Sequence, residues 1–277
     1  MGQDKSLAKR RVISPSSEES AMKFVVIGGT GLIGSKAVSR LERLGHEVVV
    51  AAPSTGIDIL TGQGLDDAMA GTEVVIDLAN SPSFEDEAVL SFFRTAGRNI
   101  LEAETRAGVG HHVALSVVGT DKLAESGYFR GKIAQEALIR ESSVPYSIIH
   151  STQFFEFLPG IIKSGADGDQ VRLPSALVQP ISSDEVADAV VRIATSEPAN
   201  GIVEIAGPEA YWMADLAQRY AEQTGDGRKV VGDVSTPYFG AKIHETTLIP
   251  AGEAWLGKIN FDRWMSQYKD GQAVARK

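Results

Sequence analysis

Three residues in the stretch ALSVVGTDKLAESGYFRGK, residues 114–132, have types that together could transfer a proton: Ser116, Tyr128 and Lys132. Tyr128 and Lys132 stand four positions apart in a helical pattern, so both lie on one face of that helix. An ammonium group favours the phenolate form of a nearby tyrosine, whose ordinary pKa of about 10 is too high for proton exchange near neutrality. The same spacing also occurs by chance at ordinary helix starts, so the surroundings must decide.

The elements around this stretch follow a regular order from residue 23 onward. Apolar runs typical of buried strands are KFVVIGG, HEVVVAA, EVVIDLA, HHVALSVVG and PYSIIHS, and the helical patterns between them include residues 62–70, 85–107 and 129–142. Continuous Val/Ile runs indicate a parallel sheet covered on both faces. The alternation predicts an α/β fold with a doubly wound parallel sheet (Rossmann fold), which binds ligands at the carboxyl ends of its strands.

The chain divides into three predicted parts. Residues 1–21 are polar and are expected to form a flexible leader, and residues 22–150 form a dinucleotide-binding core. Residues 151–277 are expected to form a smaller C-terminal substrate lobe plus returning elements of the core sheet. Their patterns predict a helix from the capping box Ser182-x-x-Glu185, a strand GIVEIAG, a helix MADLAQRYAEQTG and a last helix near 259–268.

Composition excludes several classes of function. The chain has 277 residues, a net charge of -9 and no cysteine, so disulfides, thiolate catalysis and cysteine-bound metals are ruled out. The acidic balance argues against nucleic acid or an anionic membrane as a partner. No apolar run approaches the roughly 18 to 20 residues that span a bilayer. His111 and His112 lack a third ligand nearby, so no metal is predicted. We expect a cytoplasmic monomer or homodimer that acts on a small molecule.

A glycine-rich segment, VVIGGTGLIGSKAV, joins the first strand to the first helix. Gly28 permits the tight turn, Gly31 lets the backbone approach a pyrophosphate, and Gly34 lets the helix pack against the strand. The helix N-terminus adds N–H groups and a positive dipole end. With Thr30, Leu32 and Ile33, these glycines are the predicted cofactor-binding loop.

The spacing GxxGxxG in GGTGLIG resembles the extended and atypical short-chain dehydrogenase/reductase superfamily, and most closely its NmrA-like, NAD(P)H-binding branch. Further segments that carry the resemblance are RNILEAETRAGVGHHVALSVVG, YFRGKIAQEALIRESSVPYSIIHSTQFFEF and QPISSDEVADAV, so that it spans about residues 22–206. The resemblance implies that Tyr128 exchanges the proton while hydride moves to or from the nicotinamide. It implies that Lys132 lowers the tyrosine pKa and binds the nicotinamide ribose, and that Ser116 holds the substrate carbonyl oxygen.

The choice of nicotinamide cofactor depends on the end of the second strand, VVVAAPSTG, which carries no acid before Asp58. An acid there would bind the ribose of NAD and repel the 2′-phosphate of NADP. Ser54, Thr55 and the Gly56 N–H could hold that phosphate, although the arginine common in NADP-dependent relatives is absent; they could also form an ordinary polar turn. Asp58 resembles the family aspartate that meets the adenine, and Asn80 is expected to line the cofactor. NADP is therefore predicted, with NAD as the alternative.

The substrate side departs from the family. His150 and Ser151 stand where relatives usually carry Arg-Pro. The following Gln153, Phe154, Phe155 and Phe157 are expected near the cleft, where aromatic rings either line an apolar wall suited to a quinone or belong to the core. Asn99 resembles a helix asparagine that supports proton transfer in relatives, and is equally consistent with a surface position.

Two functions of different class fit these residues. The first is an NAD(P)H-dependent reductase of a carbonyl or quinone-like small molecule, with Tyr128 as proton donor. The second is a non-catalytic NAD(P)-binding redox sensor that reports to a partner protein, as the NmrA resemblance implies. A nucleotide-sugar epimerase or dehydratase ranks third, because such relatives carry a larger substrate lobe. The presence of all three of Ser116, Tyr128 and Lys132 favours the reductase.

Overall fold

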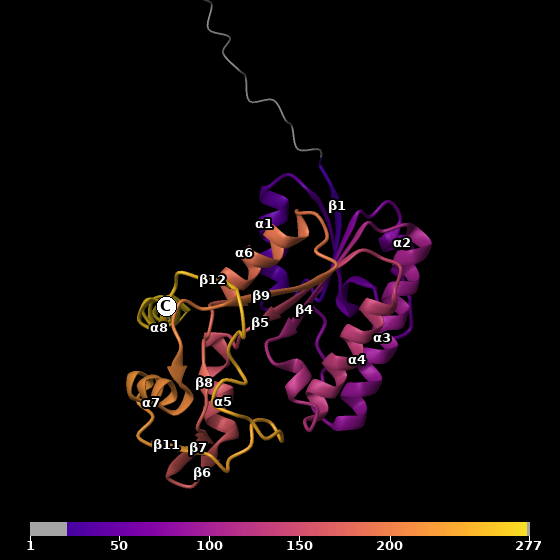
Figure 1. The fold of residues 1–277 in the computed structure, drawn as a ribbon. Helices are drawn as coiled ribbons and strands as arrows, with labels where there is room; N and C mark the ends of the chain where they lie inside the picture. The colour runs from indigo at the N-terminus through magenta and orange to yellow at the C-terminus, as the bar shows by residue number, and fades with distance from the viewer. Residues whose placement is uncertain (1–20, 276–277) are drawn as a thin grey trace, which may run out of the picture.

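The computed structural model describes residues 21–275, so the predicted leader over 1–21 lies almost entirely outside the described residues. Its main body is built on a seven-stranded sheet in the order β12-β9-β5-β4-β3-β1-β2, and every neighbouring pair in it is parallel. The doubly wound α/β fold predicted from the sequence is thereby confirmed (Figure 1). The elements of this body are β1 (Lys23–Ile27), α1 (Gly34–Arg43), β2 (Glu47–Ala51), α2 (Leu65–Met69), β3 (Val74–Asp77), α3 (Asp86–Ala107), β4 (His111–Val117), α4 (Gly127–Glu141), β5 (Tyr146–Ser151), α6 (Ser183–Ala194), β9 (Gly201–Ala206) and β12 (Trp255–Leu256).

Helices cover both faces of this sheet. On one face α1 and α6 pack together over a buried cluster that includes Phe24, Ile76 and Val190. On the other face α3 packs along α4 (Figure 1), over clusters that include Ile100 and Ile148. Because both faces are covered, the central strands carry the uninterrupted apolar runs seen in the sequence.

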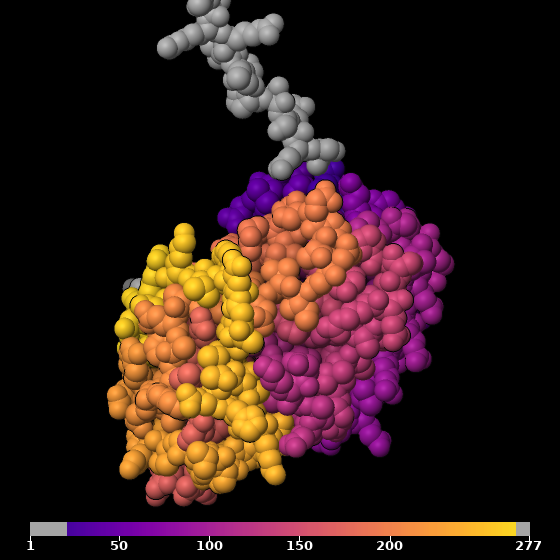
Figure 2. Space-filling view, in the orientation of Figure 1, coloured from indigo at the N-terminus to yellow at the C-terminus, as the bar shows by residue number. Residues whose placement is uncertain are grey.

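The remaining elements form a second lobe with its own core, shown at the lower left of Figure 1. They are α5 (Leu158–Ser164), β6 (Ala166–Asp167), β7 (Gln170–Pro174), β8 (Leu177–Val178), β10 (Tyr211–Trp212), α7 (Met213–Thr224), β11 (Lys229–Asp233) and α8 (Phe261–Ala275). Its aromatic centre stacks Phe155 on Trp264, with ring centroids 5.3 Å apart. Figure 2 shows yellow residues of the C-terminal part of the chain lying over this lobe and beside the surface of the larger body.

Two predicted helices have different limits. The helix expected over 62–70 is shortened to α2, because Gly62 and Gly64 adopt positive φ angles of 80° and 74° just before it. The last helix begins at Phe261 and continues to Ala275, beyond the predicted end at 268. Within residues 21–275, no helix is both long and apolar enough to cross a membrane.

Candidate active site

The glycine loop between β1 and α1 has the shape of a dinucleotide cradle. Gly28 has a φ of +71°, and a Cβ atom there would lie 2.8 Å from the Leu78 carbonyl oxygen. A Cβ on Gly34 would lie 2.1 Å from the carbonyl oxygen of Gly28, so the helix start can approach the loop only as glycine. Both contacts are closer than side-chain atoms tolerate, which explains the residue type at each position.

The rest of this loop is open to a ligand. Thr30, Gly31 and Leu32 are exposed, while Ile33 is buried in the core and anchors the loop. Among the described residues, the N–H groups of Leu32 and Ile33 have no backbone acceptor, and the first turn of α1 carries no acid. Free N–H groups at a helix start bind phosphate, so these residues fit the pyrophosphate of a dinucleotide.

The turn after β2 offers fewer groups to a 2′-phosphate than its sequence indicates. The Thr55 hydroxyl lies 2.8 Å from the carbonyl oxygens of both Val50 and Ala52. The Gly56 N–H donates to Pro53, at 3.1 Å. Of the three groups predicted to bind the phosphate, Ser54 is the one that makes no hydrogen bond within the described residues. Its side chain is exposed.

Asp58 and Asn80 both stabilise local turns. Asp58 Oδ1 accepts the N–H of Leu60 at 2.8 Å, and Asn80 Oδ1 accepts the N–H of Ser81 at 3.1 Å. Asn99 donates its amide to the carbonyl oxygens of Ile59 and Leu60, each at 2.9 Å. Asn99 therefore fixes the loop that carries Asp58, which differs from both roles considered for it from the sequence.

Tyr128 lies in the first turn of α4 inside a group of aromatic rings. The rings of Phe84, Phe93 and Phe129 lie 6.1, 6.3 and 5.4 Å from it, centroid to centroid. Its hydroxyl makes no hydrogen bond with a described residue, and burial raises the pKa of Tyr128 to about 12. The phenol is therefore protonated at neutral pH, as a proton donor must be.

Lys132 lies one turn further along α4 and is only 2% exposed. Its Nζ donates to the Leu115 carbonyl at 2.8 Å and to Gln135 Oε1 at 2.5 Å, and lies 4.8 Å from the centre of the Phe93 ring. Gln135 in turn donates to Asp77 at 2.7 Å. Burial lowers the pKa of Lys132 to about 8, against the raising effects of Asp77 and Glu136. The same Phe93 ring contacts Tyr128 and Lys132, so the structure brings these two residues together.

Ser116 belongs to a different group. Its Oγ, 3% exposed, donates to Glu136 Oε1 at 2.5 Å and lies 3.5 Å from the Thr120 hydroxyl. His150 Nε2 lies 2.9 Å from the same carboxylate oxygen, and Arg140 donates to the other at 2.7 Å. Although burial raises the pKa of Glu136, the hydrogen bonds from His150, Ser116 and Arg140 lower it to about 2. The structure does not join Ser116 to Tyr128.

These two groups occupy adjoining flanks of α4. The Tyr128 flank carries Tyr128, Lys132 and Gln135, and the Glu136 flank carries Ile133, Glu136 and Arg140. Lys132 and Glu136, four positions apart, are neighbours where the two flanks meet, and Glu136 raises the pKa of Lys132. Glu136 follows Tyr128 by eight residues, or about 12 Å of helix. The Glu136 flank borders a cavity of about 740 Å³, which is lined by Thr120, His150, Glu204 and the segment 249–253 among others but not by Tyr128 or Lys132.

The aromatic residues after β5 mostly serve the core. Phe155 is buried against Phe261 and Trp264, and Phe154 belongs to the same buried cluster as Ile33 of the glycine loop. Phe157 stacks on Phe154 at 5.0 Å and is 50% exposed. Of the two possibilities considered from the sequence, the core therefore applies to Phe154 and Phe155, and the three rings do not form an apolar wall together.

The rings beside Tyr128 instead come from distant segments. Phe84 follows β3, and Tyr238 lies in the irregular segment after β11. Single-sequence patterns offer no signal for such partners. Gln153 is placed beside Tyr238, because its amide acts on the hydroxyl of that residue.

The two histidines at the start of β4 are structural. His112 Nδ1 pairs with the buried Glu104 at 2.7 Å, and His111 Nε2 lies 2.9 Å from the Ser147 hydroxyl. No group of three or more potential metal ligands occurs in the part of the chain that the structure describes.

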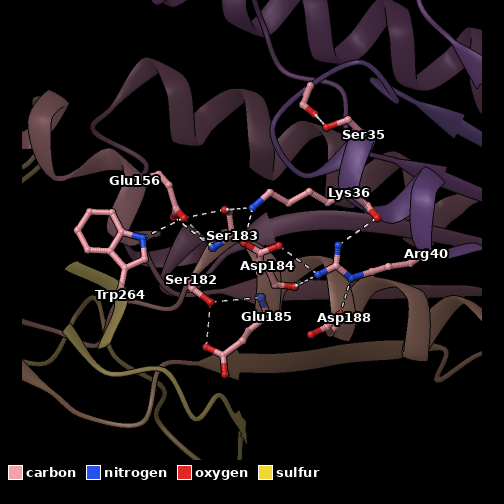
Figure 3. Close-up of polar contacts among 11 residues, drawn as sticks. Ser35, Lys36, Arg40, Glu156, Ser182, Ser183, Asp184, Glu185, Asp188 and Trp264 are labelled. Carbon is pink, nitrogen blue, oxygen red and sulfur yellow. Dashed lines mark hydrogen bonds and ion pairs between the residues drawn. The ribbon is translucent and has the colours of Figure 1, made fainter. Parts of the chain in front are cut away.

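A polar network fixes the glycine-loop helix against the rest of the molecule (Figure 3). Lys36 on α1 donates to Asp184 at 2.5 Å and to the Ser183 hydroxyl at 2.9 Å, at the start of α6. Glu156, just before α5, accepts from the Ser183 hydroxyl at 2.7 Å and from the Trp264 indole at 3.1 Å. The network therefore ties the cofactor loop to the second lobe through α6.

The predicted cap of α6 lies beside this network. Ser182 Oγ accepts the Glu185 N–H at 3.3 Å and donates to the Glu185 carboxylate at 3.0 Å, which confirms the predicted helix start.

Together, the glycine loop and the Tyr-x-x-x-Lys helix are typical of a protein that binds a nicotinamide dinucleotide. Residues 28–197 match the family described as NAD(P)H-binding, and the chain belongs to that family. The resemblance to the short-chain dehydrogenase/reductase superfamily and its NmrA-like branch is thereby confirmed.

Two curated relatives show the range within this similarity. The divinyl chlorophyllide a 8-vinyl-reductase of Oryza sativa subsp. indica is 30% identical over 232 residues, which cover 68% of this chain and 55% of that protein. The photosystem II assembly factor Ycf39 of Cyanophora paradoxa is 21% identical over 227 residues, covering 76% and 71%. The chain thus spans about half the length of the reductase.

Solved structures share the fold over most of the chain. MoeE5 in complex with UDP-glucose and NAD superposes with a TM-score of 0.68 at 17% identity, covering 92% of this chain and 100% of that one. A dTDP-4-dehydrorhamnose reductase from Clostridium acetobutylicum has a TM-score of 0.68 at 16% identity, with coverage of 92% and 100%. At such identities the similarity establishes the fold alone.

Proposed function

We propose that the protein is an NADPH-dependent reductase of a carbonyl or quinone-like small molecule, with Tyr128 as the proton donor. The observation that carries this proposal is the Tyr128 flank of α4. A protonated phenol without a hydrogen-bond partner and a buried ammonium contact the same Phe93 ring.

Each residue of this flank has a defined task. NADPH, when held by the glycine loop and Lys132, would supply the hydride that the carbonyl carbon accepts. Tyr128 donates its proton to the carbonyl oxygen and becomes a phenolate. Lys132 stabilises that phenolate with its ammonium group and binds the nicotinamide ribose, while Gln135 and the Leu115 carbonyl hold its Nζ in place. Because burial raises the pKa of Tyr128 to about 12, the phenol carries its proton at neutral pH and can donate it.

The preference for NADPH rests on the turn after β2. It carries no acid that would repel a 2′-phosphate, and the exposed Ser54 hydroxyl is available to bind one. NAD is the alternative, because the turn has no arginine.

A second function has its own support. The hydroxyl of Ser116 is bound to Glu136, so the Ser-Tyr-Lys set is not assembled around one point. A redox sensor that binds NAD(P) and docks on a protein partner needs only Lys132, and one relative is named as an assembly factor.

The test is NADPH oxidation, followed by absorbance, with a panel of quinones, aldehydes and ketones. Tyr128→Phe is expected to lower kcat by about 100-fold or more, the usual contribution of a general acid, while the Kd for NADPH stays unchanged. If the wild-type protein binds NADPH but reduces no acceptor, the sensor function replaces the reductase. If Tyr128→Phe retains full turnover, the proton donor is a different group.

A further inference from the structure

The face of the sheet beside α4 is only partly covered where it reaches β9. By strand register, Ser116, His150 and Glu204 form one row across β4, β5 and β9, and the side chains of such a row lie on the same face. Glu136 of α4 covers the first part of this row, since it is hydrogen-bonded to both Ser116 and His150. Ile202, two residues before Glu204 on the same face, is 48% exposed. The cavity of about 740 Å³ lies beside this part of the sheet, and Ile202 and Glu204 line it.

One ring nitrogen of His150 is free to meet a ligand in this cavity. His150 lines the cavity although it is only 6% exposed. Its Nε2 lies 2.9 Å from Glu136 Oε1, and an ionised carboxylate can only accept. Nε2 therefore carries the proton of the neutral ring, which leaves Nδ1 as an acceptor. Nδ1 makes no hydrogen bond to a described residue, yet it is not fully enclosed.

The charges on the cavity wall are mostly unpaired carboxylates. Three lining carboxylates form no ion pair within residues 21–275: Asp121, Glu204 and Glu253. The Arg140 guanidinium is already bound to Glu136, at 2.7 Å. Among these described lining residues, Lys122 is the cation that has no carboxylate partner. Three unpaired carboxylates against one unpaired ammonium favour a positively charged ligand.

Apolar side chains complete the wall. Ile133 of α4, Ile202 of β9 and Ile249 line the cavity. Its volume lies in the range of sites that hold small organic molecules. A ligand that uses the whole wall therefore combines a cationic end with an apolar body.

We propose that this cavity is a second ligand site, separate from the dinucleotide site, that binds a primary ammonium compound with an apolar body. The ammonium donates to the Glu204 carboxylate and to His150 Nδ1, and the body packs against the three isoleucines. Neither the glycine loop nor Tyr128 lines this cavity. The inference is therefore independent of the proposed reductase function.

The test compares three probes that share a phenyl ring and differ in charge: 2-phenylethylammonium, 2-phenylethanol and 3-phenylpropanoate. Binding to the full chain is measured by calorimetry near neutral pH. We expect the ammonium to bind at least about tenfold more tightly than the alcohol, because hydrogen bonds from a charged donor are the stronger ones. The anion should bind more weakly than both. Added NADPH should change the Kd of the ammonium by less than about twofold, since the two sites share no residue.

Two variants remove one negative charge each while keeping the shape of the side chain. Glu204→Gln is expected to weaken ammonium binding by at least about fivefold, while binding of 2-phenylethanol stays within about twofold of wild type. Glu253→Gln, at an exposed position of the wall, should weaken it by about twofold. The matched control is Glu141→Gln, at an exposed position of α4 outside this cavity, which should bind the ammonium like the wild-type protein.

Three results would overturn the inference: ammonium binding that is absent or no tighter than that of the alcohol, an ammonium affinity that is unchanged in both Gln variants of the wall, or displacement of the ammonium by NADPH. None of these measurements depends on NADPH oxidation, so a failure of the reductase function is distinguished from a failure of this site.

Discussion

The two flanks of α4 both carry buried polar side chains, but these differ in how many hydrogen bonds they make. On the Glu136 flank, the carboxylate of Glu136 has hydrogen-bond partners in Ser116, His150 and Arg140. On the Tyr128 flank, no hydrogen bond engages the Tyr128 hydroxyl within residues 21–275, and burial raises its pKa to about 12. The first group is complete without a ligand, and the second is not. Residue type alone therefore does not separate the two groups here; the hydrogen bonds of Glu136 and of the Tyr128 hydroxyl do.

Replacing Lys132 should have the largest effect of the changes that test this comparison. Lys132→Met removes the ammonium that stabilises the phenolate, so kcat/KM for NADPH oxidation is expected to fall by about 100-fold, or about 2.7 kcal/mol. The free energy of unfolding should change by less than about 2 kcal/mol, because removal of a buried charge offsets the loss of the donor to the Leu115 carbonyl and Gln135 Oε1. Steady-state kinetics and denaturant unfolding measure the two effects.

The matched control is Lys122→Met, a change at an exposed lysine beside the cavity. Its kinetics should be those of the wild-type protein. A similar loss of kcat/KM in both lysine variants would contradict the distinction between the flanks.

Replacing Glu136 should produce the opposite result, a large loss of stability with the chemistry retained. Glu136→Leu leaves the buried Ser116 and His150 without their partner, and the free energy of unfolding is expected to fall by about 3 kcal/mol. The folded pKa of Glu136 lies near 2, below its ordinary 4.5. The stability from this carboxylate is therefore present above about pH 4.5 and lost as the pH falls toward 2.

Urea unfolding of Glu136→Leu at pH 7 measures this loss. Glu141→Leu, at an exposed position of the same helix, should change stability by less than about 0.5 kcal/mol. Equal stability of the two variants would show that the Glu136 flank is not a structural centre.

A pH profile sharpens the comparison further. Lys132 carries its charge below its pKa of about 8 and loses it above that pH. Because kcat/KM reports the ionisation of the free protein, it is expected to fall above about pH 8, by up to about tenfold per pH unit. In Lys132→Arg, where the charge persists, whatever activity remains should show no such break. A wild-type profile that is flat through pH 9 would contradict the role of this ammonium.

The sequence predicted the fold and the cofactor loop well, because their signals are local. Strand β1, Gly28 and Gly34 are close together in the chain. The contact that requires glycine at position 34 is with Gly28 in the same loop, whereas the one at position 28 is with Leu78, outside the motif. The spacing of Tyr128 and Lys132 is equally local, since one helix sets it.

The partners of these residues could not be predicted in the same way. Ser116 is held by Glu136, twenty positions later, and by strand register it lies beside His150. Tyr238, whose ring packs against Phe129, lies in an irregular segment that has no periodic pattern. Gln153 is one polar residue among several after β5, and only the arrangement of the folded chain shows that its amide lies beside Tyr238.

The sequence predicts that Ser116 acts with Tyr128, whereas in the structure its hydroxyl is bound to Glu136. If the hydroxyl stays there, replacing Ser116 should have the smallest effect of these changes. Ser116→Ala removes one hydrogen bond from a carboxylate that keeps two others, so the free energy of unfolding is expected to fall by about 1 kcal/mol. Turnover should stay within about twofold of wild type, since the hydroxyl proton is directed to Glu136 and not toward Tyr128. A loss of kcat comparable to that in Tyr128→Phe, with folding and NADPH binding intact, would mean that Ser116 changes partner when substrate binds. The Glu136 flank would then be part of the active site, and saturation in the free protein would no longer identify the structural residues.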